Sequence, residues 1–190
     1  MYHGTQMSME EALSLEDAAI NYDSLYKMRC TAEAILAAGL TPALLAHRGV
    51  NSARHLTSLG FDAIHLRNET FCRQTIAVIA AEDIRTHFIQ TAGDAVSIAG
   101  TPAQRLLGMQ CADLLGVCVA QPAEAEQVLR LIAEYKGPDC VLEGVSSECL
   151  LSTCIGAKAL RRCGLTLAHV VRATSMTTNQ LAMQGFELAL

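Results

Sequence analysis

The hydrophobic and polar positions of this chain repeat in a short unit that begins with glycine. The unit consists of a glycine, an apolar residue, a small polar residue, three variable positions and a leucine or another aliphatic residue. Copies begin at Gly39, Gly49, Gly60, Gly108, Gly144, Gly164 and Gly185, and a shortened copy without the apolar residue begins at Gly100. Eight copies exceed what an Ala- and Leu-rich chain gives by chance, so we interpret the unit as an internal repeat.

Each position of the unit predicts one part of a junction between two helices. Glycine accepts the left-handed conformation that ends a helix, and the apolar residue after it packs back on that helix. The small polar residues are good N-caps for the next helix, namely Thr41, Asn51, Asp62, Thr101 and Thr166. Pro42 and Pro102 then stand at the first helical position, where a missing N–H costs nothing.

These junctions predict an all-α fold, an irregular array of short helices. About two helical turns fit between successive glycines, and helices of that length need packing on their neighbours. The array resembles an α-solenoid only in this logic, because its unit is far shorter than the roughly 33–47 residues of ankyrin, TPR or HEAT repeats. No specific family is recognised from the residues.

Three segments depart from the unit. Residues 8–21 open with Ser8 and Glu11 in a capping box, which predicts a separate acidic helix. Residues 70–92 have the spacing of longer helical structure, although 75–81, TIAVIAA, could equally be a buried strand. Residues 122–136 predict a longer helix that Gly137-Pro138 ends. We therefore expect an acidic N-terminal arm with one helix over 1–28 and a helical repeat domain over 29–190, with a possible hinge at 137–138.

Composition adds an expectation about partners. Hydrophobic residues make up 51% of the chain and charged residues 17%, against a usual charged share of about 25%. This excludes a disordered chain and favours a surface that is partly covered by protein partners or by further copies in a homo-oligomer, although a compact Ala-rich domain would also fit. Most of the net charge of −5 lies in residues 1–28, and tryptophan is absent. Without a basic stripe, direct nucleic-acid binding is not expected.

The ends and the cysteines suggest a location. No stretch is long and apolar enough to span a membrane, and the N-terminal residues fit neither a secretory signal nor a transit peptide. The chain has eight cysteines. Without an export signal, the expectation is reduced, mostly buried thiols in an intracellular, reducing compartment.

No motif for catalysis, a metal or a cofactor stands out. The last four cysteines, from Cys140 to Cys163, lack the paired spacing of a zinc site, and no glycine-rich phosphate loop occurs. His65 and His169 share a repeat position, five residues after Gly60 and Gly164, which is typical of a repeated surface or groove position. We therefore predict no catalytic, metal-binding or cofactor-binding residue. The candidates for a contact surface are His65, His169, Glu10, Glu11, Glu16 and Asp17.

The leading hypothesis is a non-enzymatic structural or protein–protein interaction subunit of a larger assembly. Repeat arrays leave an extended surface that suits this role. One alternative is an α/β enzyme with an unrecognised active site, whose strands would be residues 75–81, 139–145 and 168–173. The other is a protein-binding subunit of a ribonucleoprotein complex.

Overall fold

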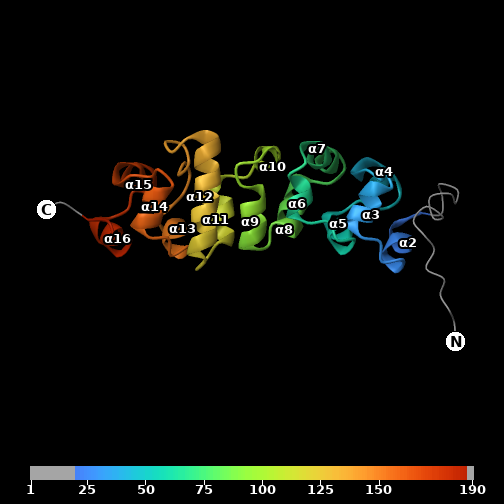
Figure 1. Cartoon of the computed structure of the whole chain (residues 1–190), viewed down its shortest axis with the longest axis horizontal. Coiled ribbons are helices and arrows are strands. Elements are labelled where there is room, and N and C mark those ends of the chain that lie inside the picture. Colours follow the sequence, from blue (N-terminus) through green and yellow to red (C-terminus); the bar gives the residue numbers. More distant parts are fainter. Residues whose placement is uncertain (1–19, 188–190) are drawn as a thin grey trace, which may run out of the picture. The chain divides into compact units, whose positions relative to one another are not determined.

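The computed structural model describes residues 20–187 and is built from short helices (Figure 1). Its 15 helices, α2 to α16, are joined by turns, and the described residues contain no strand. The all-α prediction is confirmed for this part of the chain. The helix predicted over 8–21 lies outside the described residues except for 20 and 21, which precede α2. Glu10, Glu11, Glu16 and Asp17 all lie outside them. The predicted arm and the hinge at 137–138 stay predictions.

The described helices fall into two compact units, one ending at Phe88 and one beginning at Ile89. The first unit contains α2 (Tyr22–Lys27), α3 (Ala32–Ala37), α4 (Pro42–His47), α5 (Ala53–Ser58), α6 (Ala63–Leu66), α7 (Glu69–Val78) and α8 (Ala81–Phe88). The second contains α9 (Ala92–Ile98), α10 (Pro102–Leu106), α11 (Cys111–Val117), α12 (Pro122–Lys136), α13 (Ser147–Ser152), α14 (Ala157–Arg162), α15 (Leu167–Thr174) and α16 (Thr178–Met183).

The predicted glycine junction is a hydrogen-bonded turn that ends several of the helices. At Gly39, for example, the glycine has φ +76°, its N–H donates to the Leu36 carbonyl, and the Leu40 N–H donates to the Ile35 carbonyl. This pair of bonds is the Schellman motif. The same pair recurs at Gly49, Gly60, Gly108, Gly164 and Gly185. Gly100 and Gly144 also have positive φ but make different hydrogen bonds.

One copy of this turn has no glycine, and the sequence pattern missed it. Arg29 has φ +54°, its N–H donates to the Tyr26 carbonyl, and the Cys30 N–H donates to the Leu25 carbonyl. Cys30 stands at the position of the apolar residue, and Thr31 caps the next helix, α3. A search of the sequence for the N-cap residue, instead of the glycine, would find this copy of the repeat unit.

The predicted N-caps are mostly confirmed, with one shift and one exception. Thr41, Asp62 and Thr166 accept backbone N–H groups at the starts of α4, α6 and α15. The prediction for Asn51 is wrong by one residue, because Ser52 caps α5 in this longer copy of the unit. Thr101 stands at the N-cap of α10, but its hydroxyl donates to the Ile98 carbonyl at 2.6 Å instead.

The strands that the enzyme alternative requires are absent from the described residues. Helix α7 runs through residues 75–78, and Ile79 is extended only as its C-cap before α8 begins. Residues 139–144 form turns, and 168–173 lie inside α15. The strand interpretation of all three segments is therefore wrong, because two of them lie mostly in helices and the third forms turns. The helix over 122–136 is confirmed, and Gly137 is its C-cap.

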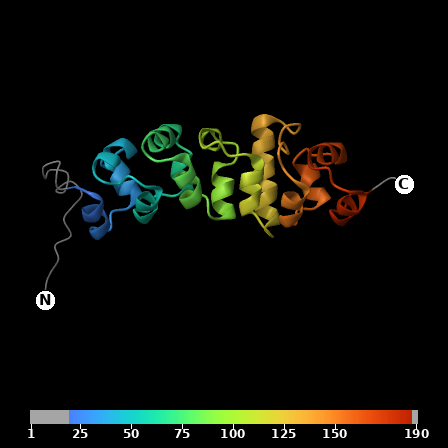
Figure 2. The same ribbon diagram turned by 180° about the vertical axis from the view of Figure 1, so that it is seen from behind.

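In the first unit, helices three positions apart along the chain lie side by side. Helix α4 contacts α7, and α5 contacts α8. Tyr22 of α2 stacks on His55 of α5, with ring centroids 4.1 Å apart. Figure 2 shows these helices from the opposite side. The N-caps of α2 and α5, Asn21 and Ser52, lie 31 residues apart, and those of α4 and α7, Thr41 and Asn68, lie 27 apart.

The second unit is organised around its longest helix. Helix α12 contacts α9, α11 and α14, and it buries Ala125, Val128, Leu129 and Ile132. The turn at Gly100 lies directly against it, since a Cβ there would be 2.5 Å from the Leu131 carbonyl oxygen. Glycine is therefore required at this position because a side chain would collide with α12 and because the backbone has a positive φ. Across both units, none of the described helices has the length and apolar character to cross a bilayer.

Candidate contact surface

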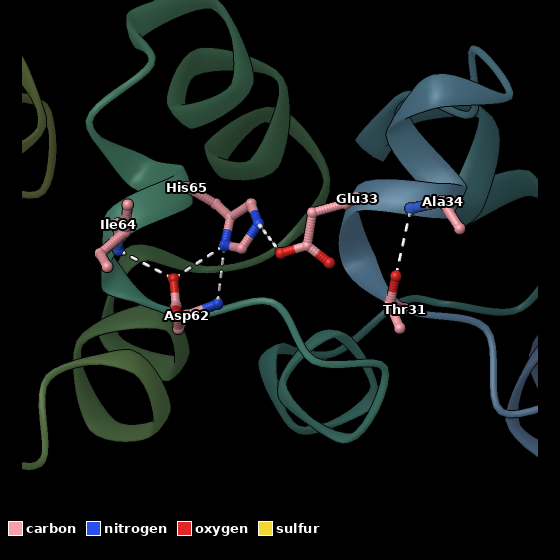
Figure 3. Close-up of polar contacts among 6 residues, drawn as sticks. All are labelled: Thr31, Glu33, Ala34, Asp62, Ile64 and His65. Atoms are coloured by element: carbon pink, nitrogen blue, oxygen red, sulfur yellow. Dashed lines mark hydrogen bonds and ion pairs between the residues drawn. The ribbon is translucent and has the colours of Figure 1, made fainter.

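His65 belongs to the cap of helix α6. Asp62 is the N-cap, and its carboxylate accepts the Ile64 N–H at 3.0 Å. His65 stands three residues later, where its Nδ1 lies 3.2 Å from the Asp62 backbone nitrogen and 2.8 Å from the Asp62 carboxylate (Figure 3). This is a capping box in which histidine takes the place of the usual Glu or Gln.

The other side of the His65 ring reaches a neighbouring helix. Its Nε2 lies 3.9 Å from a carboxylate oxygen of Glu33, near the start of α3 (Figure 3). Hydrogen bonds from the backbone at Glu33 and from Thr31 lower the pKa of the Glu33 carboxyl. The ring also meets Phe61 edge to face, with centroids 5.3 Å apart, and its side chain is only 14% exposed. His65 is thus wedged between two helices and an aromatic pair.

His169 repeats this arrangement at the start of α15. Its Nδ1 lies 3.0 Å from both the backbone nitrogen and the hydroxyl of Thr166, the N-cap. Its Nε2 lies 3.2 Å from Asp139, in the turn after α12. Arg172 donates to the same carboxylate at 2.9 Å and lowers the pKa of Asp139. The His169 side chain is 21% exposed.

The repeat position of the two histidines therefore has a structural origin. Each is the N3 residue of its helix, and each links the helix start to a carboxylate on another segment. The sequence contains the signal for this role, namely a capping residue three positions earlier, but repeat equivalence alone did not identify it. A role of His65 and His169 in binding a partner stays a prediction, as does that of the acidic arm.

A hollow of about 370 Å³ lies beside His65 in the first unit. Leu36 and Ile64 border it, and their side chains are 38% and 61% exposed. Pro42 and Phe71 also line it, and the Phe71 ring stacks on Phe61 at 5.3 Å. Large aliphatic side chains that remain exposed around a concave surface are typical of protein-binding sites. Among the residues that line this hollow, only His65 was predicted from the sequence to belong to a contact surface.

The cysteines do not form a chemical site in the described part of the chain. All eight are free, and Cys72, Cys111, Cys118 and Cys163 are buried. Burial raises the pKa of the Cys111 thiol to about 12 and that of Cys72 to about 11, so these thiols stay protonated and unreactive. Within residues 20–187, no group of three or more His, Cys, Asp or Glu side chains is arranged to hold a metal ion.

Comparison with protein-family models, with curated proteins and with solved structures gave no match to this chain.

Proposed function

We propose that this protein is a non-enzymatic structural or protein–protein interaction subunit of a larger assembly, built as an α-solenoid-like array. The observation that carries the proposal is the side-by-side packing of helices three positions apart in the first unit. Three short helices would then make one coil of about 27–31 residues, somewhat shorter than the roughly 33–34 residues of ankyrin and TPR units. Stacked coils bury a continuous core and leave an extended surface for partners.

The exposed apolar residues of the first unit support a contact role. Ile64 and Leu36 border the same hollow although they come from helices α6 and α3. Burying one large aliphatic side chain contributes about 1.5–3 kcal/mol, so two of them are a substantial part of a binding site for a partner protein. The absence of strands in the described residues removes the framework on which the enzyme alternative depended.

A matched pair of surface variants tests the proposal. The full chain, with and without Ile64→Glu, is used to capture partners from its native source and is analysed for mass by light scattering. Val171→Glu on α15 is the control, because Val171 is also an exposed large aliphatic residue, at 44%. We expect a specific partner or a multiple of the 20.3 kDa chain mass with the wild type and the control, and its loss with Ile64→Glu.

Two outcomes would contradict the proposal. One is a chain that stays monomeric at high concentration and captures no specific partner. The other is a partner that Ile64→Glu and Val171→Glu release equally, which would separate binding from this hollow. Ribonuclease treatment adds a control, because a partner that leaves only when RNA is digested would support the ribonucleoprotein alternative.

A further inference from the structure

A second hollow, in the unit that begins at Ile89, has a different chemical character. It has a volume of about 190 Å³ and lies between α10, the loop after it and the last turn of α12. Gln104 and Met109 line it from within, while Arg105, Tyr135 and Lys136 line it from the surface. Its volume is below the roughly 300–1,000 Å³ of sites that bind drug-sized ligands, so it fits a single side chain.

The inner wall of this hollow is fixed by hydrogen bonds. Gln104 is 3% exposed, its amide nitrogen donates to the Met109 carbonyl at 3.2 Å, and its amide oxygen accepts the Gly100 N–H at 2.9 Å. Gly100 in turn lies against the Leu131 carbonyl of α12, with no room for a Cβ. These contacts tie the segments before and after α10 to Gln104 and place the Gly100 turn against the long helix, so the hollow exists before any ligand arrives.

The rim carries two positive charges that no carboxylate balances. Neither Asp nor Glu lines the hollow, and neither Arg105 nor Lys136 makes an ion pair with any residue that the structure describes. Four other arginines are paired, namely Arg73, Arg85, Arg162 and Arg172. Burial raises the pKa of the Cys111 thiol, and the positive charge of Lys136 opposes part of that rise. Cys111 directly follows Gln110, which lines the hollow. Asp113 is engaged by the Gln110 N–H at 2.7 Å and does not line it.

We infer that this hollow binds a glutamate side chain of a partner protein. Arg105 and Lys136 would neutralise the carboxylate, and charge-assisted hydrogen bonds of this kind are the strong ones. Tyr135, a residue that is 48% exposed, and Met109 offer an apolar wall for the aliphatic part of the side chain. This inference rests on the proposed function, which supplies a protein partner, and it adds the chemistry that the partner presents.

The test uses the full chain and a minimal probe. N-acetylglutamate N-methylamide is titrated into ¹⁵N-labelled protein, and the shifts of the Gly108 N–H and the Gln104 side-chain amide are followed. We expect saturable shifts that weaken as salt is added. Lys136→Gln and Arg105→Gln are each expected to weaken binding about tenfold, whereas Lys158→Gln, an exposed lysine on α14, leaves it unchanged.

Four results would overturn the inference. The glutamine analogue of the probe could bind as well as the glutamate one, or Lys158→Gln could weaken binding as much as Lys136→Gln. Inorganic phosphate could saturate the same amides while the glutamate probe does not, which would show an anion site of another kind. A chain that captures its partner through Ile64 but does not bind the probe keeps the proposed function and loses this inference alone.

Discussion

The helix starts at His65 and His169 have the same sequence frame but are held by different neighbours. Both histidines lie five residues after a Schellman glycine, and both place Nδ1 on the backbone nitrogen of the N-cap. His65 is then packed against Phe61 and Phe71, whereas His169 meets Asp139 together with Arg172. The local sequence thus determines the cap, and the packing of distant segments determines what the other side of the ring does.

The two units differ in the same way beyond these histidines. The Arg73–Glu69 and Arg85–Glu82 ion pairs of the first unit each lie within one helix. The Arg162–Glu126 pair of the second unit joins helices α14 and α12, with bonds of 2.6 and 2.5 Å. These arginine–carboxylate pairs of the first unit thus lie within helices, whereas those of the second unit join separate segments.

The largest expected effect is a difference in stability loss when a turn glycine of each unit is replaced by alanine. Gly100→Ala places a Cβ 2.5 Å from the Leu131 oxygen, which adds about 1–3 kcal/mol of forced movement to the roughly 1–2 kcal/mol of the left-handed conformation. Gly60 also has a positive φ, +86°, but a Cβ there would have its nearest atom 3.7 Å away. Gly60→Ala therefore costs only the free energy of the left-handed conformation. Urea unfolding followed by circular dichroism measures both. Equal losses would show that the close approach to α12 carries no energetic weight.

The histidines are expected to respond differently to glutamine. Gln180 already serves as the N3 residue of a capping box at α16, where its Oε1 accepts the Thr177 N–H at 2.8 Å, so glutamine can replace the cap. His169→Gln should therefore leave the unfolding free energy nearly unchanged. His65→Gln should lose about 1 kcal/mol, because it keeps the cap but removes the ring from Phe61.

Alanine at the same two positions provides the control for this difference. His65→Ala and His169→Ala both remove the N3 half of the capping box, which costs about 0.5–1.5 kcal/mol in either unit, and His65→Ala also loses the ring contact with Phe61. If His65→Gln is as stable as the wild type, the aromatic packing does not distinguish the two junctions.

A smaller effect is expected from acid. Arg162 lowers the pKa of Glu126 below its ordinary 4.5, so the unfolded chain binds this proton first. The stability from this pair is present above about pH 4.5 and is lost as pH falls through the lower folded pKa. Glu126→Gln should therefore flatten the pH dependence of stability in that range, by less than about 1 kcal/mol. Glu69→Gln, in a pair within one helix, is the control and should change it less.

The smallest effect leaves stability unchanged and concerns the position of a proton. At His65 the Asp62 carboxylate oxygen lies 2.8 Å from Nδ1, nearer than the Asp62 backbone nitrogen at 3.2 Å, which favours a proton on Nδ1 at the expense of that backbone hydrogen bond. At His169 the backbone N–H of Thr166 donates to Nδ1 and Asp139 faces Nε2, which favours a proton on Nε2. Imidazole ¹⁵N shifts of the neutral rings distinguish the two tautomers. The same tautomer at both positions would contradict the contrast between the junctions.

Local features were predictable from the sequence because they are encoded within a few residues. The Schellman glycines, the Thr-Pro helix starts and the helix ending at Gly137 depend only on neighbouring side chains and φ preferences. The turn at Arg29 was missed because an arginine there has to bear a left-handed conformation that glycine accepts freely. Ser52 was missed because one extra residue in that copy moves the cap.

The candidate sites were less predictable because packing brings their parts together. Glu33 contacts His65 across a separation of 32 residues, and Tyr135 and Gln104, which are 31 residues apart, line the same hollow. No local rule specifies such a meeting before the helices stack. The repeat position marked His65 and His169 correctly as equivalent, but their burial and their carboxylate partners depend on segments outside the repeat unit.

The shortness of the helices has a consequence for how this chain tolerates change. An α-helix leaves its first four N–H and last four C=O groups without internal partners, so a six-residue helix such as α3 or α14 consists almost entirely of ends. Interior helix positions, where both backbone groups bond within the helix, are therefore rare in this chain's short helices. A systematic mutational scan should therefore find the positions where substitution lowers stability most at intervals of about ten residues, at caps and turn glycines. Outward-facing positions between them should tolerate substitution.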